Sequence, residues 1–557
     1  MKRKNIKLTA FLSLAVACFG FGFNSPAFTQ ETSRQRVAAP TPTVTPTPQV
    51  NPAVVPTPVP TPFTTSVSKR TLSDLQAQIR LVLSRPELRR GHIGVKIVSL
   101  DTNKTVFEEN AEKYFMPASN MKSYTIAAAL EKLSPNFRFV TSVYAPAPPD
   151  ETGTIRGDLT IYGRGDISIS TSFNNGDYHK GIDSLTDKIV QAGVKRIEGN
   201  LVGDESYFSG NPIPLSWEWD DLQWYYGAEV SALPLNDNAL DLSVKPSSTV
   251  GALCIAQALP FNPVMRIVNR CVTSAGNVKR DLRIVKKLDQ NILEITGTMP
   301  LGDRGFSGYV TVSRPANLFL ALLRQNLQQR GIVITGQNRL IDASEKINIP
   351  SVTPMEIAKL ESPPLSLIAA KTMKPSQNLY TETILWTLGE QMKMPLQNSN
   401  ATDKNPLFNS KATSSERGIY VVQEFLRQIG IAPDSVIQWD GSGLSRHNLI
   451  TPASAVELYS YMAKQSPFKD VWMESLTIGG IDGTLKNRFK GTTANGNVRG
   501  KTGTIDQVSA LSGYVTTASG ERLVFSILVN SVNQTNQRTA TIDDIVVLLS
   551  KFDGRIN

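Results

Sequence analysis

The sequence predicts an α+β protein in which helices flank an antiparallel sheet that carries a large β-rich insert. Near the start of the folded chain, "HIGVKIVSLDTNKTVFEEN" alternates apolar and polar residues around a "DTNK" turn, which predicts a β-hairpin. Near the end, "GNVRGKTGT", "SALSGYVTTAS" and "RLVFSILVNSV" predict three consecutive strands with Gly-containing turns. We therefore expect one antiparallel sheet that is assembled from both ends of the chain.

Helices are predicted around these strands from the spacing of apolar residues. The segments are "LSDLQAQIRLVL" from residue 72, "FMPASNMKSYTIAAAL" from 115, "KPSQNLYTETILW" from 374 and "IDDIVVLLSKF" from 542. Between them, short β-like runs such as "GDLTIYG" and "ILEITGTM" predict the insert. At 557 residues the chain is too long for a single core. We expect a discontinuous main domain (69–140 and 346–557) and an inserted module (141–345) with an inner subdomain at about 240–300.

The first 27 residues are predicted to be a signal peptide. A basic start precedes the apolar run "LTAFLSLAVACFGFGF" and small residues, which is the pattern of export signals. A membrane anchor is the alternative, although about 16 apolar residues are short for a span. Cys18 in "AVAC" resembles a lipoprotein site, but the aromatic residues behind it argue against lipidation. We expect an exported protein, periplasmic or associated with the cell wall, without a transmembrane anchor after signal removal.

Residues 28–68 form a Pro/Thr-rich linker. The run "APTPTVTPTPQVNPAVVPTPVPTPF" cannot build a packed core and favours extended polyproline II. It is either a spacer or a disordered tail with no task of its own.

The net charge of +10 does not indicate a nucleic-acid partner. Residues 1–70 hold eight Lys or Arg and one acid, so +7 of the charge belongs to the signal and linker. A basic binding face on the folded part is therefore not supported.

Three cysteines occur, and Cys18 leaves with the signal peptide. In an exported protein the remaining Cys254 and Cys271 predict one disulfide, which would stabilise by roughly 3 kcal/mol in the chain-entropy model. Two buried free thiols are the alternative.

Ser119 and Lys122 are a candidate nucleophile and base. Three residues make most of a helical turn, so both side chains share one face. A helix N-terminus favours an anion forming at Ser119, and the apolar neighbours favour a neutral Lys122. A capping serine beside a solvated lysine is the alternative, and Ser66 and Lys69 repeat the same spacing within the linker.

Histidine chemistry and zinc are not supported by the sequence. His92, His179 and His447 are the only histidines, none of them in a suggestive motif, and no paired Cys or HExxH ligands occur. We expect no metal and no cofactor.

Two further motifs follow in order. Ser376 and Asn378 form a Ser-x-Asn triplet that opens a predicted helix, and Lys501, Thr502 and Gly503 form a Lys-Thr-Gly triplet on a predicted strand. A serine and an amide can pass a proton to a leaving amine, and a strand lysine attracts a carboxylate. Gly503 lets a substrate backbone approach the strand edge.

With these motifs, the chain resembles the active-site serine penicillin-recognising enzymes, whose signatures are Ser-x-x-Lys, Ser-x-Asn and Lys-Thr-Gly. The long gap from Ser119 to Ser376 is similar to that of the DacB type of D-Ala-D-Ala carboxypeptidase, a class C low-molecular-mass penicillin-binding protein. "DGSGLSRHNLITP", "GGIDGTL" and "GYVTTASGERLVF" are also similar to that family. The resemblance covers roughly residues 70–550 and implies a β-lactamase/transpeptidase-like fold.

The resemblance implies roles for individual residues. Ser119 would be acylated, with Lys122 as base, and Ser376, Asn378 and Lys501 would transfer protons and bind substrate. Thr502 and Thr504 would hold the terminal carboxylate, and the N–H groups of Ser119 and Thr504 would form the oxyanion hole. Peptidoglycan stem peptides are the implied substrates and β-lactams the implied covalent inhibitors.

Two more residues are implied for stems that contain diaminopimelate. Asp221 in "WEWDDLQWYYGA" and Arg446 in the Gly-Leu-Ser-Arg loop match the family's acidic and arginine positions. Ordinary packing is the alternative for the Trp-rich stretch. The chain is thus expected to be a D-Ala-D-Ala carboxypeptidase that also acts as a D,D-endopeptidase. The alternatives are a β-lactamase or esterase on the same fold and a non-catalytic wall-binding protein.

Overall fold

The computed structural model describes residues 70–260, 262–346, 354–393 and 411–556. The predicted signal peptide, Cys18 and the Pro/Thr-rich linker lie outside these residues. Within the part of the chain that is described, no helix is both long enough and apolar enough to cross a membrane.

The central sheet has six strands in the order β19-β20-β21-β22-β1-β2, and each neighbouring pair is antiparallel. β1, from near the start of the folded chain, pairs with β22, from near its end, with Val95 opposite Ile527. The predicted assembly of the sheet from both ends is confirmed. The strands are β1 (His92–Ser99), β2 (Thr105–Glu109), β19 (Thr477–Ile478), β20 (Arg499–Ile505), β21 (Val508–Thr516) and β22 (Arg522–Asn530).

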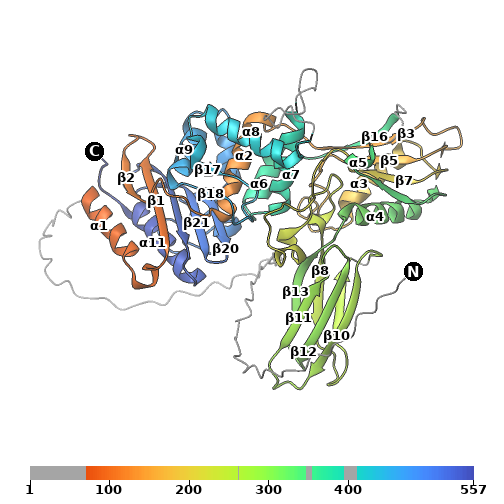
Figure 1. The fold of residues 1–557 in the computed structure, drawn as a ribbon, viewed down its shortest axis with the longest axis horizontal. Helices are drawn as coiled ribbons and strands as arrows, with labels where there is room; N and C mark the ends of the chain where they lie inside the picture. Colours follow the sequence, from red (N-terminus) through yellow and green to blue (C-terminus); the bar gives the residue numbers. More distant parts are fainter. Residues whose placement is uncertain (1–69, 261, 347–353, 394–410, 557) are drawn as a thin grey trace, which may run out of the picture. The chain divides into compact units, whose positions relative to one another are not determined.

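Both faces of this sheet are buried, as β22 illustrates. Phe525 and Ile527 lie in an apolar core with α1 and α11, whereas Val524 and Leu528 lie in a second core with the other helices. Successive strand side chains point to opposite faces, so one strand supplies both cores. The first layer is α1 (Leu72–Leu83) beside α11 (Thr535–Lys551) (Figure 1). The second contains α2 (Met121–Leu133), α6 (Leu365–Met373), α7 (Asn378–Gln391), α8 (Ser414–Gln428), α9 (Pro452–Lys464) and α10 (Lys469–Ser475).

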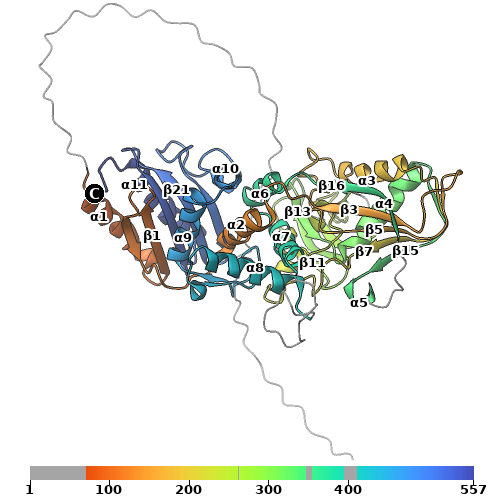
Figure 2. The same cartoon turned by 90° about the horizontal axis from the view of Figure 1, so that it is seen from above.

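The insert follows α2 and contains a mixed five-stranded sheet, in the order β15-β7-β5-β3-β16, and a small parallel sheet, β14-β6-β4. Two helices, α3 and α4, pack beside the larger sheet (Figure 2). The elements are β3 (Val140–Ala145), β4 (Thr154–Ile155), β5 (Leu159–Tyr162), α3 (Lys180–Gln191), β6 (Arg196–Ile197), β7 (Leu201–Asp204), α4 (Pro315–Gln329), β14 (Val333–Ile334), β15 (Asn338–Ile341), α5 (Ala343–Lys346) and β16 (Met355–Glu361).

The insert's sheet extends beyond the boundary at residue 345 that the sequence suggests. β16 pairs antiparallel with β3, so residues up to 361 belong to this sheet rather than to the main domain. A single strand carries no local signal of the sheet that it joins, because its partner lies far away along the chain.

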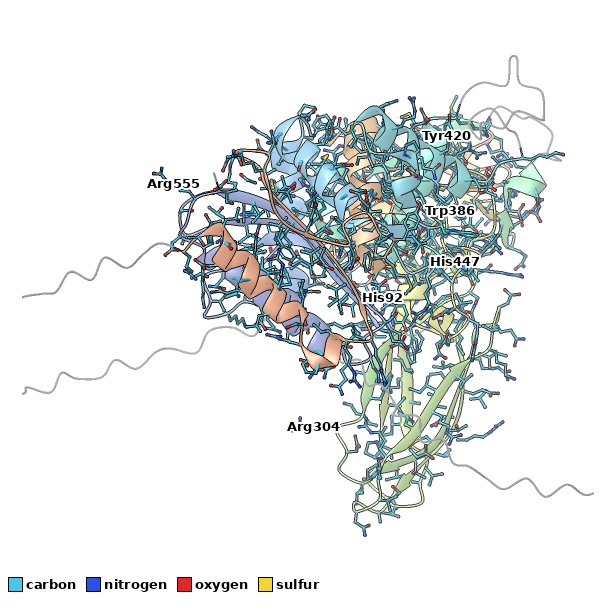
Figure 3. All side chains as sticks on the ribbon, turned by 60° about the vertical axis from the view of Figure 1, so that its left-hand side comes forward. His92, Arg304, Trp386, Tyr420, His447 and Arg555 are labelled. Carbon is cyan, nitrogen blue, oxygen red and sulfur yellow. A yellow bond between two sulfur atoms is a disulfide. The ribbon has the colours of Figure 1, made fainter. Side chains whose placement is uncertain are left out.

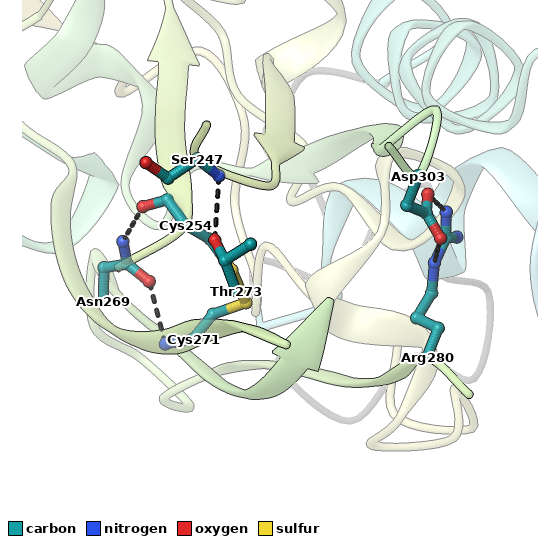
Figure 4. The surroundings of a disulfide bond; sticks show 7 residues. All are labelled: Ser247, Cys254, Asn269, Cys271, Thr273, Arg280 and Asp303. Atoms are coloured by element: carbon teal, nitrogen blue, oxygen red, sulfur yellow. Dashed lines mark hydrogen bonds and ion pairs between the residues drawn. A yellow bond between two sulfur atoms is a disulfide. The ribbon is translucent and has the colours of Figure 1, made fainter. Parts of the chain in front are cut away.

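The inner part of the insert consists of two three-stranded sheets, β13-β8-β9 and β10-β12-β11. It ends later than the suggested residue 300, because β13 pairs with β8. Cys254 and Cys271 are joined by a disulfide, and the Asn269 side chain bonds the backbone of both cysteines (Figure 4). The strands are β8 (Ala239–Lys245), β9 (Ile255–Leu259), β10 (Arg266–Ser274), β11 (Asp281–Lys286), β12 (Ile292–Pro300) and β13 (Phe306–Thr311).

Candidate active site

Ser119 lies in the single 3-10 turn η2 (Ala118–Asn120), directly before α2. Its side chain is partly exposed, while α2 behind it is buried from Met121 to Leu130. No side chain caps α2, so Ser119 does not play the capping role that was the alternative. Asn120 Nδ2 donates to the Lys501 carbonyl at 3.1 Å and ties this turn to β20. Ser119 is therefore accessible to a substrate, at the N-terminus of a buried helix whose position is fixed by β20.

Lys122 is completely buried and points at three oxygens. Its Nζ lies 3.0 Å from Ser119 Oγ, 2.6 Å from Asn378 Oδ1 and 2.6 Å from the Ser442 carbonyl oxygen. The amide and carbonyl oxygens can only accept, so a neutral amine donates to both and turns its lone pair toward the Ser119 hydroxyl. Burial lowers the pKa of Lys122 to about 7, although Asp440 and Glu382 oppose this shift. The geometry and the pKa both suit a general base.

Ser376 lies in the turn between α6 and α7, and Asn378, the first residue of α7, contacts Lys122. Ser376 has a φ of 64°, a left-handed conformation that is unusual for serine. Asn378 Nδ2 donates to the Tyr226 carbonyl at 2.8 Å, so its oxygen is the atom that faces Lys122. The insert, which supplies Tyr226, thus fixes the orientation of this amide.

Lys501 on β20 is also completely buried. Its Nζ donates to Ser376 Oγ at 2.8 Å and to the Thr502 carbonyl at 2.8 Å. Burial and, secondarily, the charge of Lys122 hold the pKa of Lys501 well below its usual value. Two buried lysines in one site disfavour each other's charge. We call Ser119, Lys122, Ser376, Asn378 and Lys501 the buried cluster.

Gly503 brings β20 against the nucleophile turn. A Cβ at this position would lie 2.4 Å from the Pro117 carbonyl and 3.1 Å from the Ser119 nitrogen, so only glycine fits. Beside it, Thr502 Oγ1 donates to Thr484 Oγ1 at 2.6 Å, and the hydroxyl of the exposed Thr504 donates to the Gly503 carbonyl. The predicted carboxylate-binding threonines thus line the strand next to Ser119.

Arg446 and Asp221 lie at the edge of the site, together with Glu218. Arg446 Nε is 2.9 Å from Glu218 Oε1, and its Nη1 donates to the Asp506 carbonyl at 3.1 Å. Burial raises the pKa of Asp221 to about 6, as do the neighbouring Asp220 and Glu218, while Arg446 lowers it. We call Glu218, Asp221 and Arg446 the rim. The sequence predicted two of its members but not the pairing of Arg446 with Glu218.

Two buried carboxylates near Lys122, those of Asp440 and Glu382, were not predicted from the sequence. Asp440 accepts hydrogen bonds from the Gly443 and Ser445 backbone, from Asn448 and from Trp217 Nε1 of the insert. Glu382 accepts from two consecutive backbone N–H groups, those of Gly441 and Ser442. The signal for Asp440 was its place in "DGSGLSRHNLITP". Glu382 has no motif of its own.

None of the three histidines reaches the cluster. His447 is exposed and lies on Trp439, with ring centroids 4.9 Å apart, and His92 is exposed on β1 (Figure 3). His179 makes an edge-on ring contact with Tyr178. Among the described residues, no group of three or more His, Cys, Asp or Glu side chains is placed to hold a metal.

The D-Ala-D-Ala carboxypeptidase 3 (S13) family matches residues 75–552. The chain belongs to this family. A D-alanyl-D-alanine carboxypeptidase of Actinomadura sp. is 30% identical over 494 residues, which are 87% of this chain and 86% of the relative. The chain is therefore a serine hydrolase of family S13, and the resemblance carried by the three motifs is confirmed.

Solved structures support the fold of this S13 chain. Penicillin binding protein 4 (dacB) from Haemophilus influenzae matches with a TM-score of 0.70 at 24% identity, covering 86% of this chain and 97% of the other. The same protein complexed with a β-lactam matches with a TM-score of 0.66 at 22% identity, covering 84% and 98%. The predicted fold class is confirmed.

Proposed function

We propose that this S13 chain is a serine D-Ala-D-Ala carboxypeptidase that acts on peptidoglycan stem peptides through an acyl-enzyme on Ser119. One observation carries the proposal: a reachable Ser119 hydroxyl lies 3.0 Å from the Nζ of a buried lysine whose other two partners can only accept hydrogen bonds. A serine in this setting loses its proton to the lysine as it attacks a carbonyl.

The acylation step follows from this arrangement. Ser119 Oγ attacks the carbonyl of the penultimate D-Ala, its proton passes to Lys122 Nζ, and negative charge develops on the carbonyl oxygen. The backbone N–H groups of Ser119 and Thr504 would donate hydrogen bonds to that oxygen. In such sites each donor stabilises the transition state by about 3 kcal/mol.

Release of the terminal D-Ala needs a proton on its nitrogen. Ser376 Oγ, held by Lys501 Nζ at 2.8 Å, is the candidate donor, and Lys501 can resupply its proton. The C–N bond then breaks, and free D-Ala leaves. Water then hydrolyses the ester: one water proton restores the Ser119 hydroxyl, the shortened peptide leaves as a carboxylate with release of a proton to solvent, and the proton that Lys122 took is returned to Lys501. Thr502 and Thr504 would hold the terminal carboxylate beside Lys501.

Binding of β-lactams follows from the same chemistry, because the strained lactam presents a carbonyl and a nearby carboxylate. The β-lactam complex of the H. influenzae relative supports this extension. We also propose cleavage of D-Ala-diaminopimelate cross-links, in which Asp221 binds the ammonium and Arg446 the second carboxylate of diaminopimelate. Export to the periplasm or cell wall, as the predicted signal peptide implies, would bring the enzyme to these substrates.

The test is release of D-Ala from a pentapeptide that ends in D-Ala-D-Ala, together with fluorescent penicillin labelling and mapping of the labelled peptide. Release of D-Ala and a label on Ser119 are expected, with a cross-linked muropeptide dimer as the endopeptidase substrate. Rapid hydrolysis of penicillin without D-Ala release would favour the β-lactamase alternative. A folded protein without label or turnover would favour a wall-binding role.

A further inference from the structure

Glu382 lies on α7, one turn after Asn378, and its side chain is fully buried. Its Oε2 accepts from the Gly441 N–H at 3.0 Å, and its Oε1 accepts from the Ser442 N–H at 2.7 Å. The Ser442 residue held in this way offers its carbonyl to Lys122 Nζ at 2.6 Å. The carboxylate therefore fixes the backbone to which the base is bonded.

Charge is the second link between Glu382 and Lys122. Within the described part of the chain Lys122 bonds no carboxylate directly, yet Glu382 and Asp440 lie close enough to favour its ammonium form. Asp440 has four donors around it. Burial and the neighbouring Asp440 raise the pKa of Glu382, whereas hydrogen bonds from the Gly441 and Ser442 backbone and from the Ser442 side chain lower it. Each Glu382 oxygen accepts an N–H, so the arrangement fits the carboxylate form. The charged side chains that interact with Glu382 are Lys122 on α2 and Asp440 in the loop before β18 (Leu449–Ile450). Arg417 on α8, which packs against α7, pairs with Glu390 farther along the helix.

We propose that Glu382 is a positioning residue for acylation: it holds the Gly441–Ser442 backbone against Lys122 and supplies a buried negative charge that sets the pH at which Lys122 becomes a base. This inference rests on the proposed acylation of Ser119. Helix α7 would then carry two groups that act on Lys122: Asn378 contacts it directly, and Glu382 acts through the Gly441–Ser442 backbone.

The test is the pH dependence of the second-order rate constant for acylation by benzylpenicillin, over about pH 5 to 9. In Glu382→Gln the amide nitrogen cannot accept, so one backbone N–H loses its partner and we expect acylation to slow by about tenfold or more. The acidic limb of the pH–rate profile is the pH range in which the rate falls because Lys122 becomes protonated. Because Glu382→Gln removes the negative charge, this limb should move to lower pH by about one unit. Glu382→Asp keeps the charge, so acylation should slow while the acidic limb stays near that of the unmodified protein.

Glu390→Gln is the matched control. Glu390 lies two turns farther along the same helix, its side chain is 8% exposed, and it pairs with Arg417 rather than with the site. It should leave the rate and the acidic limb unchanged, and thermal melting of all variants separates lost folding from lost function. Equal displacement of the acidic limb by Glu382→Gln and Glu382→Asp, or none by either, would overturn the proposal.

A direct titration keeps this inference separate from the proposed function. The ¹³Cε resonance of Lys122, assigned with Lys122→Arg, should titrate at lower pH in Glu382→Gln than in the unmodified protein. A protein that penicillin does not acylate would refute the proposed function, and this titration would still decide the role of Glu382. An unchanged Lys122 titration would refute the charge role.

Discussion

The buried cluster and the rim hold their polar groups in different ways. Lys122 is completely buried and bonded to three oxygens, whereas Arg446 and Glu218 form one ion pair with 32% and 50% of their side chains exposed. Rearranging a dry, fully bonded group is costly, while an exposed ion pair contributes only about 0–1 kcal/mol. The catalytic groups are therefore in position before the substrate binds. Recognition of the substrate side chain, in contrast, requires Arg446 to exchange Glu218 for the substrate carboxylate.

The strongest test of this difference is Ser119→Ala. Removing the nucleophile should reduce penicillin labelling and D-Ala release to background, because Ser119 Oγ is the hydroxyl that contacts the base Lys122. Gel fluorescence after penicillin treatment measures the label. Ser66→Ala, which alters the other Ser-x-x-Lys triplet, should keep full labelling. A label that persists in Ser119→Ala would show that another serine is acylated.

Gly503→Ala should have the next largest effect. Its Cβ would lie 2.4 Å from the Pro117 carbonyl, so β20 and the nucleophile turn must separate, and small displacements of reacting groups cost up to about a hundredfold in rate. Stopped-flow acylation rates measure the loss. Gly276→Ala, where the nearest atom would be 3.3 Å away, is the matched control. An unaffected rate in Gly503→Ala would mean that the cluster tolerates displacement.

Arg446→Ala tests the rim. The unmodified protein should turn over diaminopimelate stems with a kcat/KM about tenfold higher than that for lysine stems. This ratio is at the lower end of what one charged contact contributes, because Arg446 must first break its ion pair with Glu218. Arg446→Ala should erase most of this preference and change penicillin acylation much less. Arg522→Ala, at an exposed arginine paired with Asp101, is the control. Equal turnover of both stems by the unmodified protein would show that the rim does not read the side chain.

The same preference should depend on pH through Asp221. Its pKa is raised to about 6, so it is a carboxylate above that pH and neutral below it. Only the carboxylate attracts the ammonium of diaminopimelate, and the preference should therefore be present near neutral pH and fall as pH drops through about 6. Measuring kcat/KM for both stems across that range checks it. A preference that rises on acidification would exclude Asp221 from this role.

The smallest catalytic effect is expected from the disulfide. Cys254→Ser with Cys271→Ser should lower the free energy of unfolding by roughly 3 kcal/mol while leaving penicillin acylation within about twofold of the unmodified protein, since both residues lie in the inner part of the insert. Peptide mapping without reduction should recover the cross-linked pair. Two alkylatable thiols in the exported protein would contradict the bond.

Local patterns in the sequence were enough for much of the site. The three-residue spacing of Ser119 and Lys122 places both at one helix turn, and "RLVFSILVNSV" predicts a strand. Tyr226 and Ser442 could not be found in this way, because they act through backbone carbonyls, which every residue possesses. Glu218 was equally hidden, since its partner Arg446 lies 228 residues away in the chain.

The sequence by itself determined which groups could react and the elements that carry them: Ser119 before a helix, Asn378 at the start of another, and Lys501 on a strand. Only the tertiary structure decided what surrounds each group. Lys122 meets Asn378 and Ser442 across 256 and 320 residues of chain, and such contacts follow from how the helices pack on the sheet. Burial and hydrogen bonds of this kind depend on the whole fold, and they are what convert an ordinary lysine into a base.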